Sequence, residues 1–544
     1  MAVRFVSVDH DTPMLLPPDL RDWVPADHIV HFVMDAVGLL DLSSARINHR
    51  GTGSAQYPPA MMLGLLIYSY ATGTFSSRKI EKLTYENLAV RFLSGDTHPD
   101  HDSICTFRRE NRELMESAFH RILHCAALSQ VLKVGDITVA IDGTKILANA
   151  SKHGAVSHGH ALEQMKLLED QIAELLAKAE DADSAPLQDG LSIPAEIARR
   201  EERIGKLREA TAVIEARAAE RCQEETQAHE QKLEAREARQ LETGRKPGGR
   251  PPVPPKQGPS PKDQYNFTDP ESRIMKAGGG FQQCYNAQAA VEVDSRLIVG
   301  GHVTDAPNDK RQLIPALGSI SPEAGKTGTG LVDSGYYSAA SVTHVESGGG
   351  PRILAATGRK KHGRSVAELE SREDPPAPPE GAGIAEVMAW RTSTAAGKEL
   401  YGLRKQTVEP VFGIIKEALG FRRFHLRGLS KVNLEWTLVR LAYNIKRLYH
   451  IDRAAKSRQQ AVAPGSGRDL TAVLERQGAG VERNPGPNRK TPDLTASGAH
   501  GTCRKSKAGQ ASLKTESNGR LILWRKLIRS LRHVVDPHPN APAY

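Results

Sequence analysis

The stretch Ile137–Asn149 reads ITVAIDGTKILAN and marks the point where the chain changes from helical to strand patterning. The residues ahead of Asp142 are mostly apolar or β-branched, a composition typical of a buried strand. Asp142 and Gly143 then end the run. An Asp at such a place either forms a turn or presents a carboxylate at the edge of a sheet. The stretch therefore predicts a sheet core and supplies a first candidate for a reactive group.

Two later segments place an acidic residue in a comparable position. Asp333 ends the apolar run in GLVDSGYYS, and Glu409 lies in VEPVFGIIK, where Lys416 follows about two turns further along the expected helix. Hard divalent cations prefer carboxylate oxygens, and a pair of such ions supports phosphodiester chemistry. Each acid also has an ordinary interpretation, as a turn former or as support for a helix N-terminus before Pro410. As a set, Asp142, Asp333 and Glu409 predict a DNA-processing enzyme that holds two Mg²⁺ or Mn²⁺ ions.

The composition limits the class of protein. At 544 residues the chain is long enough for about three or four domains. Its formal charge of +9 favours a polyanionic partner. The five cysteines are dispersed without a CxxC pair, which is typical of reduced thiols in a cytosol. No glycine cluster in the sequence is followed by GK[ST], so we expect no nucleotide cofactor.

The sequence also argues against a membrane protein and against a zinc site. The apolar segment Met61–Tyr70 is too short to span a bilayer, and no secretory leader is evident. The histidines show no HExxH and no paired Cys/His spacing. We therefore expect a location in the cytoplasm, in association with the nucleoid, and no membrane contact.

Residues 1–125 are predicted to form an all-α domain. Apolar residues recur at helical spacing in four segments: Ile29–Leu40, Pro59–Tyr70, Ser77–Leu83 and Ser103–Leu123. Basic residues in this region match those that a helix-turn-helix uses to contact DNA: Arg78, Lys79, Arg108 and Arg109. A solvated basic face explains the same residues equally well.

Strand patterning followed by helical patterning predicts an α/β catalytic domain over residues 137–450. The expected strands are a hairpin of Gln288–Val293 and Leu297–Thr304 around Asp294–Ser295, then Gly330–Asp333 and Arg352–Ala356. The expected helices are Lys398–Leu419 and Val432–Tyr449.

An insertion at residues 160–262 interrupts this core. Apolar residues at heptad-like spacing mark two arms: Leu168, Ile172, Leu175 and Ala179, then Ile197, Ile204, Leu207 and Ile214. The break at Asp181–Pro194 predicts an antiparallel helical hairpin, which either grips DNA or a second subunit or is a solvated structural arm. The closing stretch TGRKPGGRPPVPPKQGPSPK is either a linker or a minor-groove arm.

Residues 453–544 form the last compositional unit. They are basic, polar and rich in Gly and Ser, so we expect them to be largely disordered. Apolar residues punctuate Gly519–Val535, which predicts a terminal amphipathic helix. Truncation near residue 455 should leave the core intact.

Several motifs together resemble a known family. They are IDGTK, FTDPESRIMK with GGFQQCYNAQAAVEVDSRLIVG, VTDAPNDKRQL, VDSGYYS, RKQTVEPVFGIIKEALGFRRFHLRGL and KVNLEWTLVRLAYNIKRL. In this order the set resembles bacterial insertion-sequence transposases of the DDE class. The run from PPAMMLGLLIYSYATGTF to DSICTFRREN resembles the InsH-type N-terminal domain that precedes such a core.

The resemblance implies an RNase H-like catalytic core behind an α-helical DNA-binding domain. It implies Asp142, Asp333 and Glu409 as the metal-binding triad and Lys416 as the lysine of the signature helix. Tyr401 and Arg404 stand one position further from Glu409 than the usual spacing, so either Arg404 or Lys405 takes the basic role. The resemblance also implies a basic cluster just past the helix, where backbone phosphates pass: Arg422, Arg423 and Arg427.

The expected activity is cleavage of double-stranded DNA at inverted terminal repeats, followed by transfer of the cut strands to target DNA. One catalytic site for each element end implies a homodimer assembled on DNA. Two alternatives stay open at the level of sequence. One is a nuclease of the same fold that cuts without rejoining, and the other is a non-catalytic DNA-binding protein derived from a transposase.

Overall fold

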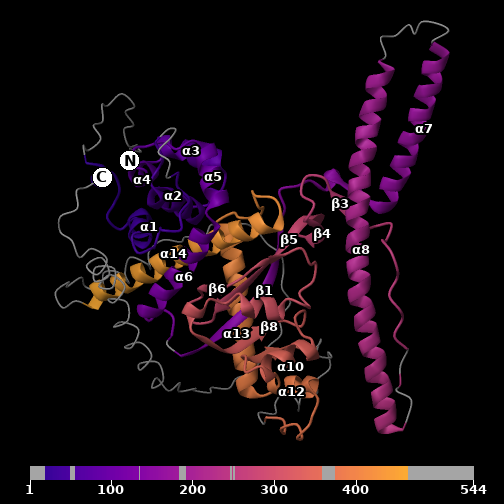
Figure 1. The fold of residues 1–544 in the computed structure, drawn as a ribbon. Coiled ribbons are helices and arrows are strands. Elements are labelled where there is room, and N and C mark those ends of the chain that lie inside the picture. Colours follow the sequence, from indigo (N-terminus) through magenta and orange to yellow (C-terminus); the bar gives the residue numbers. More distant parts are fainter. Residues whose placement is uncertain are drawn as a thin grey trace, which may run out of the picture.

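The structure is a computed structural model that describes residues 19–48, 55–133, 135–182, 192–244, 248, 251–357 and 374–462. The tail was expected to begin at residue 453, but residues 453–462 are helical and continue the helix Leu429–Val462. The rest of the predicted tail, with its terminal helix, lies outside the described residues. The described chain is mixed α/β, with N-terminal helices, a sheet and a long pair of helices set apart from both (Figure 1).

The N-terminal region is helical, as the sequence predicted. Its helices are α1 (Ile29–Val37), α2 (Pro59–Ala71), α3 (Ser77–Glu86), α4 (Leu88–Leu93), α5 (His101–Glu110) and α6 (Arg112–Leu128). Side chains of His28, Asn87 and Asp100 accept backbone N–H groups at three of the helix starts. α5 and α6 were expected as one helix. Asn111 separates them, because its side-chain oxygen accepts the Arg46 N–H (2.8 Å) and its own backbone leaves the helical conformation.

The core of the molecule is a mixed sheet built on β1 (Asp136–Leu147). Antiparallel β5 (Gly280–Glu292) flanks it on one side, and parallel β8 (Lys326–Val332) flanks it on the other. The order continues outward to β4 (Arg273–Ala277) beyond β5 and β9 (Arg352–Ala355) beyond β8. The strand expected at Leu297–Thr304 is split into β6 (Ile298–Gly300) and β7 (Val303–Thr304), both antiparallel to β5.

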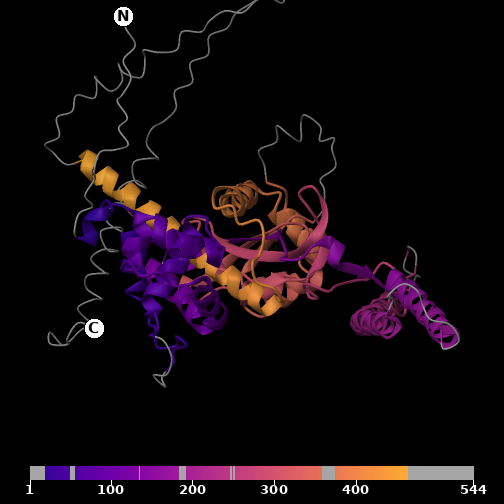
Figure 2. The same ribbon diagram turned by 90° about the horizontal axis from the view of Figure 1, so that it is seen from above.

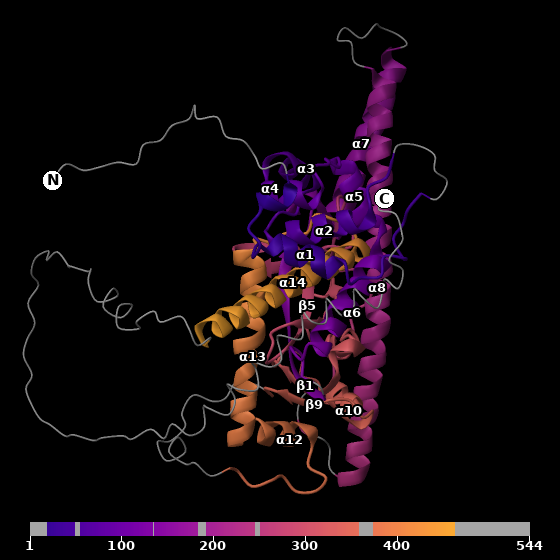
Figure 3. The ribbon, with the colours of Figure 1, turned by 90° about the vertical axis from the view of Figure 1, so that its left-hand side faces the viewer.

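Helices from the second half of the chain pack on this sheet. They are α9 (Leu313–Gly318), α10 (Ala339–Ser347), α12 (Ile384–Arg391), α13 (Ala395–Gly413) and α14 (Leu429–Val462). α14 joins the two regions, since it contacts α1, α2 and α6 as well as β6 and β7 (Figure 3). The side-chain oxygen of Asn433 accepts Val303 N–H (2.7 Å), and that of Asn444 accepts Ile298 N–H (2.9 Å). One continuous hydrophobic core therefore runs from the N-terminal helices into the sheet.

A helical hairpin stands apart from this core. It consists of α7 (His158–Ala182) and α8 (Ile193–Thr243), based on the small sheet β2 (Ala155–Ser157) and β3 (Gln264–Asn266). The hairpin has its own small cluster of buried residues, which includes Leu168, Ile204 and Leu207. Figure 2 shows it on the side of the sheet opposite the N-terminal helices.

Among the described residues, none of the helices combines the length and the apolar character that crossing a membrane requires.

Candidate functional site

The register of the sheet sets Asp142 beside Asp333. β1 and β8 are parallel, and Ala140 pairs with Leu331. Asp142 and Asp333 come two residues further along each chain, and residues two apart in a strand point to the same face. β8 ends at Val332, so Asp333 is the first residue beyond it. Asp142 and Asp333 therefore lie near each other where the parallel pairing of β1 and β8 ends, and the charge of Asp333 acts on Asp142.

β1 itself does not end at Asp142, contrary to the expectation from its apolar run. The strand continues to Leu147 because its pairing with β5 extends from Val139 to Leu147. Asp142 thus lies within a strand that stays paired on one side. This fixes its backbone more firmly than a turn would.

Asp142 is a largely buried carboxylate with few partners. Its Oδ1 accepts a hydrogen bond from Gly143 N (2.8 Å), and its Oδ2 accepts one from Arg404 Nη1 (3.1 Å). Its side chain is 20% exposed. Burial raises the pKa of Asp142 to about 6, although the Gly143 hydrogen bond and the Arg404 charge act in the opposite direction. The charges of Asp333 and Asp309 also raise this pKa, so both carboxylates lie within electrostatic reach of Asp142.

α13 presents Arg404 to this region. Arg404 is 7% exposed, and Val408 and Val411, one and two turns further on, are fully buried. This face of α13 packs against β1, β5, β8 and β9. Lys405, the other candidate for the basic role, is exposed. Arg404 is therefore the residue of the two that the structure brings to Asp142.

Glu409 lies on a different side of α13. It is exposed, and it follows Arg404 by five residues, which corresponds to a rotation of about 140° around the helix axis. Lys416 belongs to the π-helical turn Ile414–Ala418, and its Nζ donates to the Lys145 carbonyl (2.9 Å). Within the described part of the chain, no three Asp, Glu, His or Cys side chains form a group that could hold a metal ion. The structure brings Asp142 and Asp333 together and leaves Glu409 outside that pair.

A polar group that sequence reasoning did not single out lies against Gly143. Asn286 Nδ2 and Gln288 Nε2 each donate to Asp309 Oδ1 at 2.7 Å, and the Tyr336 hydroxyl donates to Gln288 Oε1. A Cβ atom at position 143 would lie 2.7 Å from Asp309 Oδ1 and 2.9 Å from Asn286 Oδ1. Any larger residue at this point would require these side chains to shift. The sequence signal that could have revealed this group is the pair of polar residues two positions apart in β5, Asn286 and Gln288, which lie opposite β1.

The structure also distinguishes the roles of four polar residues that lie in or beside the motifs FTDPESRIMK and VTDAPNDKRQL. Asn266 and Asn308 accept backbone N–H groups two or three residues further on, as turn residues do. Asp269 accepts the Tyr285 hydroxyl (2.7 Å) in the protein interior. Asp309 is the member of the four whose charge acts on the candidate catalytic carboxylate.

The basic residues predicted to contact DNA fall into two groups. Most are exposed: Arg78, Lys79, Arg109, Lys405, Arg422, Arg423 and Arg427. Arg108, in contrast, is 4% exposed and donates to the Tyr70 hydroxyl (2.9 Å) and the Phe75 carbonyl (2.8 Å). Arg404 is directed at Asp142. Both predictions need correction, because protein partners inside the fold hold these two guanidinium groups and direct them away from phosphates at the surface.

The donor atoms around Asp142 suit a hard divalent cation in type. Asp142, Asp333 and Asp309 offer carboxylate oxygens, which Mg²⁺ and Mn²⁺ prefer. Too few of these oxygens are free to bind a metal ion, since Asp309 Oδ1 already accepts two hydrogen bonds and Arg404 donates to one oxygen of Asp142. Without Glu409 the free set amounts to two carboxylates, fewer than a pair of ions needs.

Two family models match the chain. The model described as Transposase domain (DUF772) matches residues 18–110, which hold α1 to α5. The model described as Transposase DDE domain matches residues 379–449, which hold α12, α13 and the first part of α14. No curated protein and no solved structure matches the chain. The two matches support an insertion-sequence transposase of the DDE class, as the motifs had indicated.

The general function that both matches support is that of a DNA transposase. Enzymes of this class generally use divalent metal ions and act on DNA. Glu409 and Lys416 lie inside the second matched segment, whereas Asp142 and Asp333 lie outside both segments. The assignment of individual catalytic residues therefore depends on the sequence motifs and on the geometry of the sheet.

Proposed function

We propose that this chain cleaves DNA at inverted terminal repeats and transfers the cut strands to target DNA, through an RNase H-like core. In this proposal residues 1–125 bind the repeats, residues 137–450 carry out the chemistry, and a homodimer assembles on DNA. The arrangement of parallel β8 and antiparallel β5 around β1 supports the assignment of the core.

A single observation carries the proposal. Asp142 and Asp333 lie side by side at the end of a parallel strand pair, and the pKa of Asp142 is raised to about 6 by burial, with the neighbouring carboxylates adding to the effect. Crowded, partly desolvated carboxylates destabilise a fold. They are typical of metal-dependent sites.

The residues of the chain divide the work as follows. Two Mg²⁺ or Mn²⁺ ions, when bound, would activate the attacking oxygen and offset charge on the leaving oxygen. Asp142 and Asp333 would hold them, and Glu409 would complete the set only after α13 moves, because Glu409 is exposed and lies on a different side of that helix from Arg404. Arg404 must release Asp142 Oδ2 before that oxygen can serve as a ligand. Lys416 is half-buried and its Nζ donates to the Lys145 carbonyl of β1; in this proposal it would neutralise a phosphate.

The exposed basic residues support DNA contact around this site. Lys405 lies on α13, and Arg422, Arg423 and Arg427 follow in the segment between α13 and α14. Their charges would hold the phosphate backbone as it passes the carboxylates. A second set lies on the N-terminal helices and would serve the repeats: Arg78, Lys79 and Arg109.

The test begins with the DNA that flanks the reading frame, where matched inverted repeats are expected. Duplexes that carry these ends are incubated with the full chain and Mg²⁺, and cleavage and binding are measured separately. Asp142→Asn should abolish cleavage and leave binding of the repeats intact. Asp136→Asn, an exposed acid at the start of the same strand, is the matched control and should cleave normally. Loss of cleavage in both variants, or in neither, would contradict the assignment.

A second candidate function is a non-catalytic DNA-binding protein derived from a transposase. The contact of Arg404 with Asp142 and the exposed position of Glu409 favour it. Repeat binding without measurable cleavage by the unmodified chain would support this alternative. Cleavage without joining of pre-cut ends to target DNA would instead indicate a nuclease.

A further inference from the structure

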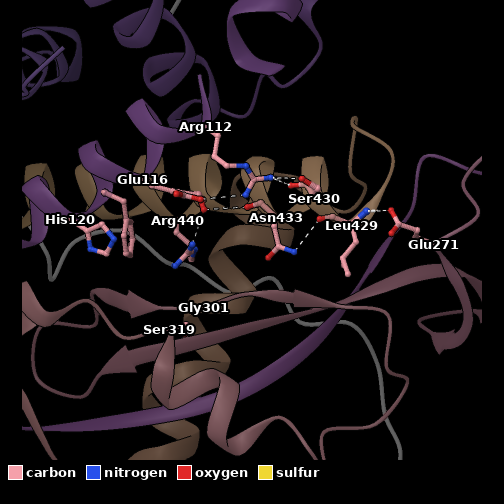
Figure 4. Close-up of a pocket in the computed structure, with 12 residues that line it drawn as sticks. Arg112, Glu116, His120, Glu271, Gly301, Ser319, Leu429, Ser430, Asn433 and Arg440 are labelled. Carbon is pink, nitrogen blue, oxygen red and sulfur yellow. Dashed lines mark hydrogen bonds and ion pairs between the residues drawn. The ribbon is translucent and has the colours of Figure 1, made fainter. Parts of the chain in front are cut away.

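A cavity that is separate from the candidate catalytic residues lies where α6 and α14 meet the sheet. Its volume is about 510 Å³, and its wall includes Arg112 and His120 from α6 and Ser430 and Arg440 from α14 (Figure 4). Gly301, between β6 and β7, lies on the opposite side. None of the residues that line it belongs to the catalytic set proposed above.

Arg440 is the unusual member of this wall. It is 6% exposed, its Nη2 donates to Thr437 Oγ1 (2.8 Å), and its Nε is buried without a hydrogen-bond partner among the described residues. Its guanidinium carbon stands 4.5 Å from the centre of the Phe119 ring. Within the described part of the chain no carboxylate lies at ion-pair distance, and burial lowers the pKa of Arg440 to about 10. A buried cation with so few partners is costly, because its lost hydration is not replaced.

The acids in the wall are already engaged. Glu116 pairs with Arg112 at 3.4 Å, and its charge acts on Arg440 without forming an ion pair. Glu271 accepts Leu429 N–H (2.6 Å) at the start of α14, eleven residues and therefore about 16 Å along the helix from Arg440. Among the described residues, the Arg440 end of the cavity thus has the charge of Glu116 nearby but no acid in an ion pair with Arg440.

We propose that this cavity is an anion site for a phosphate group, with Arg440 at its base and Arg112 at its mouth. Guanidinium groups match the geometry and charge of phosphate, and each supplies several donors. Arg112 already donates to Ser430 Oγ (2.7 Å), which holds its side chain in place across the entrance. The phosphate comes either from a nucleic-acid backbone or from free phosphate in solution. The site needs no DNA cleavage and stands apart from the catalytic proposal.

The first experiment uses inorganic phosphate and the full chain. Thermal unfolding is followed as sodium phosphate replaces sodium chloride at constant ionic strength. The wild-type midpoint should rise with phosphate, because a ligand that binds only the folded state stabilises it. Arg440→Met and Arg112→Gln should lose this rise. Arg453→Met, which removes an exposed arginine from the far part of α14, should keep it.

The second experiment identifies the source of the phosphate. Binding of a short duplex is measured by fluorescence anisotropy over a range of salt concentrations. If the source is DNA, Arg440→Met should weaken binding roughly 10-fold and lower the salt slope by about one. If it is free phosphate, only the thermal shift should respond, and that result also supports the site.

The proposal fails if the wild type shows no phosphate-specific shift and no arginine-dependent DNA binding, or if Arg440→Met keeps both. Should Arg440→Met not fold, Arg112→Gln at the mouth of the cavity decides the question. If Arg440→Met folds, it should be at least as stable as the wild type in the absence of phosphate, because the substitution removes a buried charge that has no ion pair among the described residues.

Discussion

Two buried carboxylates, Glu435 in α14 and Asp142 in β1, respond to burial in opposite ways. Glu435 is fully buried, and it accepts two backbone N–H groups, the Tyr70 hydroxyl (2.9 Å) and the His425 ring (3.2 Å). Burial acts to raise its pKa, but the hydrogen bonds and the charge of Arg108 outweigh that effect, and the pKa is lowered. This group joins the N-terminal helices to the core, since Arg108 and Tyr70 come from α5 and α2.

Asp142 is less buried, yet its pKa is raised to about 6 because burial outweighs one backbone N–H and one guanidinium. The comparison shows that the number of donors, more than depth, decides whether a buried carboxylate keeps its charge. A carboxylate whose oxygens are all occupied holds a fold together. Asp142 accepts only two hydrogen bonds from protein groups in the described structure, so its oxygens can still accept a ligand beside Asp333.

The largest effect is expected at Glu435. Glu435→Gln should destabilise the protein by about 3–5 kcal/mol at pH 7, because it leaves the Arg108 charge buried without its acid. Denaturant unfolding measures the loss. The stability that Glu435 supplies should be fully present above pH 4.5 and lost as the pH falls further, since its folded pKa is lowered. Glu417→Gln, at an exposed position, is the control. An equal loss of stability there would show that burial and hydrogen bonding do not set Glu435 apart.

Asp142 should show the opposite sign. Its pKa rises from 3.8 to about 6 on folding, so its ionisation costs the fold about 3 kcal/mol above pH 6. Asp142→Asn should therefore stabilise the metal-free protein at pH 8, and the gain should shrink as the pH falls toward 4. Denaturant midpoints across this range measure the effect. A destabilised variant at pH 8 would mean that the Arg404 pair matters more than burial.

A side chain at position 143, under the site, should destabilise the protein. Gly143→Ala should cost about 1–3 kcal/mol, because the new Cβ meets the oxygens of Asp309 and Asn286. Gly413→Ala is the matched control. Apart from the backbone of the helix itself and the neighbouring residues, no atom of the described residues lies within 4 Å of a Cβ there, so Gly413→Ala should be neutral or slightly stabilising. Thermal or denaturant unfolding compares the two variants. Equal effects would show that the polar group beside position 143 does not restrict that position.

The smallest effect is expected for an exposed ion pair near the site. Arg422 pairs with Glu417, and both side chains are mostly exposed to solvent. Arg422→Gln should change stability by less than about 1 kcal/mol, since water and salt screen such pairs. The same unfolding measurement tests this. A large loss would show that exposed pairs here rival the buried ones, and it would weaken the contrast between Glu435 and Asp142.

Much of the fold could be predicted from local patterns. The helical segments at Pro59–Tyr70 and Val432–Tyr449, and the strand before Asp142, follow from apolar spacing that is visible in short windows. The division at Asn111 and the continuation of β1 beyond Asp142 could not be predicted in the same way. Both depend on partners distant in the chain, namely Arg46 for Asn111 and β5 for β1.

The same limit applies to the candidate site. Sequence motifs identified Asp142 and Asp333, and the sheet register brings them together. Arg108 was predicted to face DNA because its helix has a basic surface pattern. Its burial is decided by Tyr70 and Glu435, which lie 38 residues before it and far beyond it in the chain.

The sequence by itself determined many of the helices and strands, the motifs of a DDE transposase and the acids able to bind a metal, because each depends on neighbouring residues. Only the tertiary structure decided which charges are buried and which partners they meet. Arg404 reaches Asp142 across 262 positions, whereas Glu409, five residues later, faces solvent. Electrostatic energy depends on distance through space and on exclusion of water, and neither can be read from position along the chain.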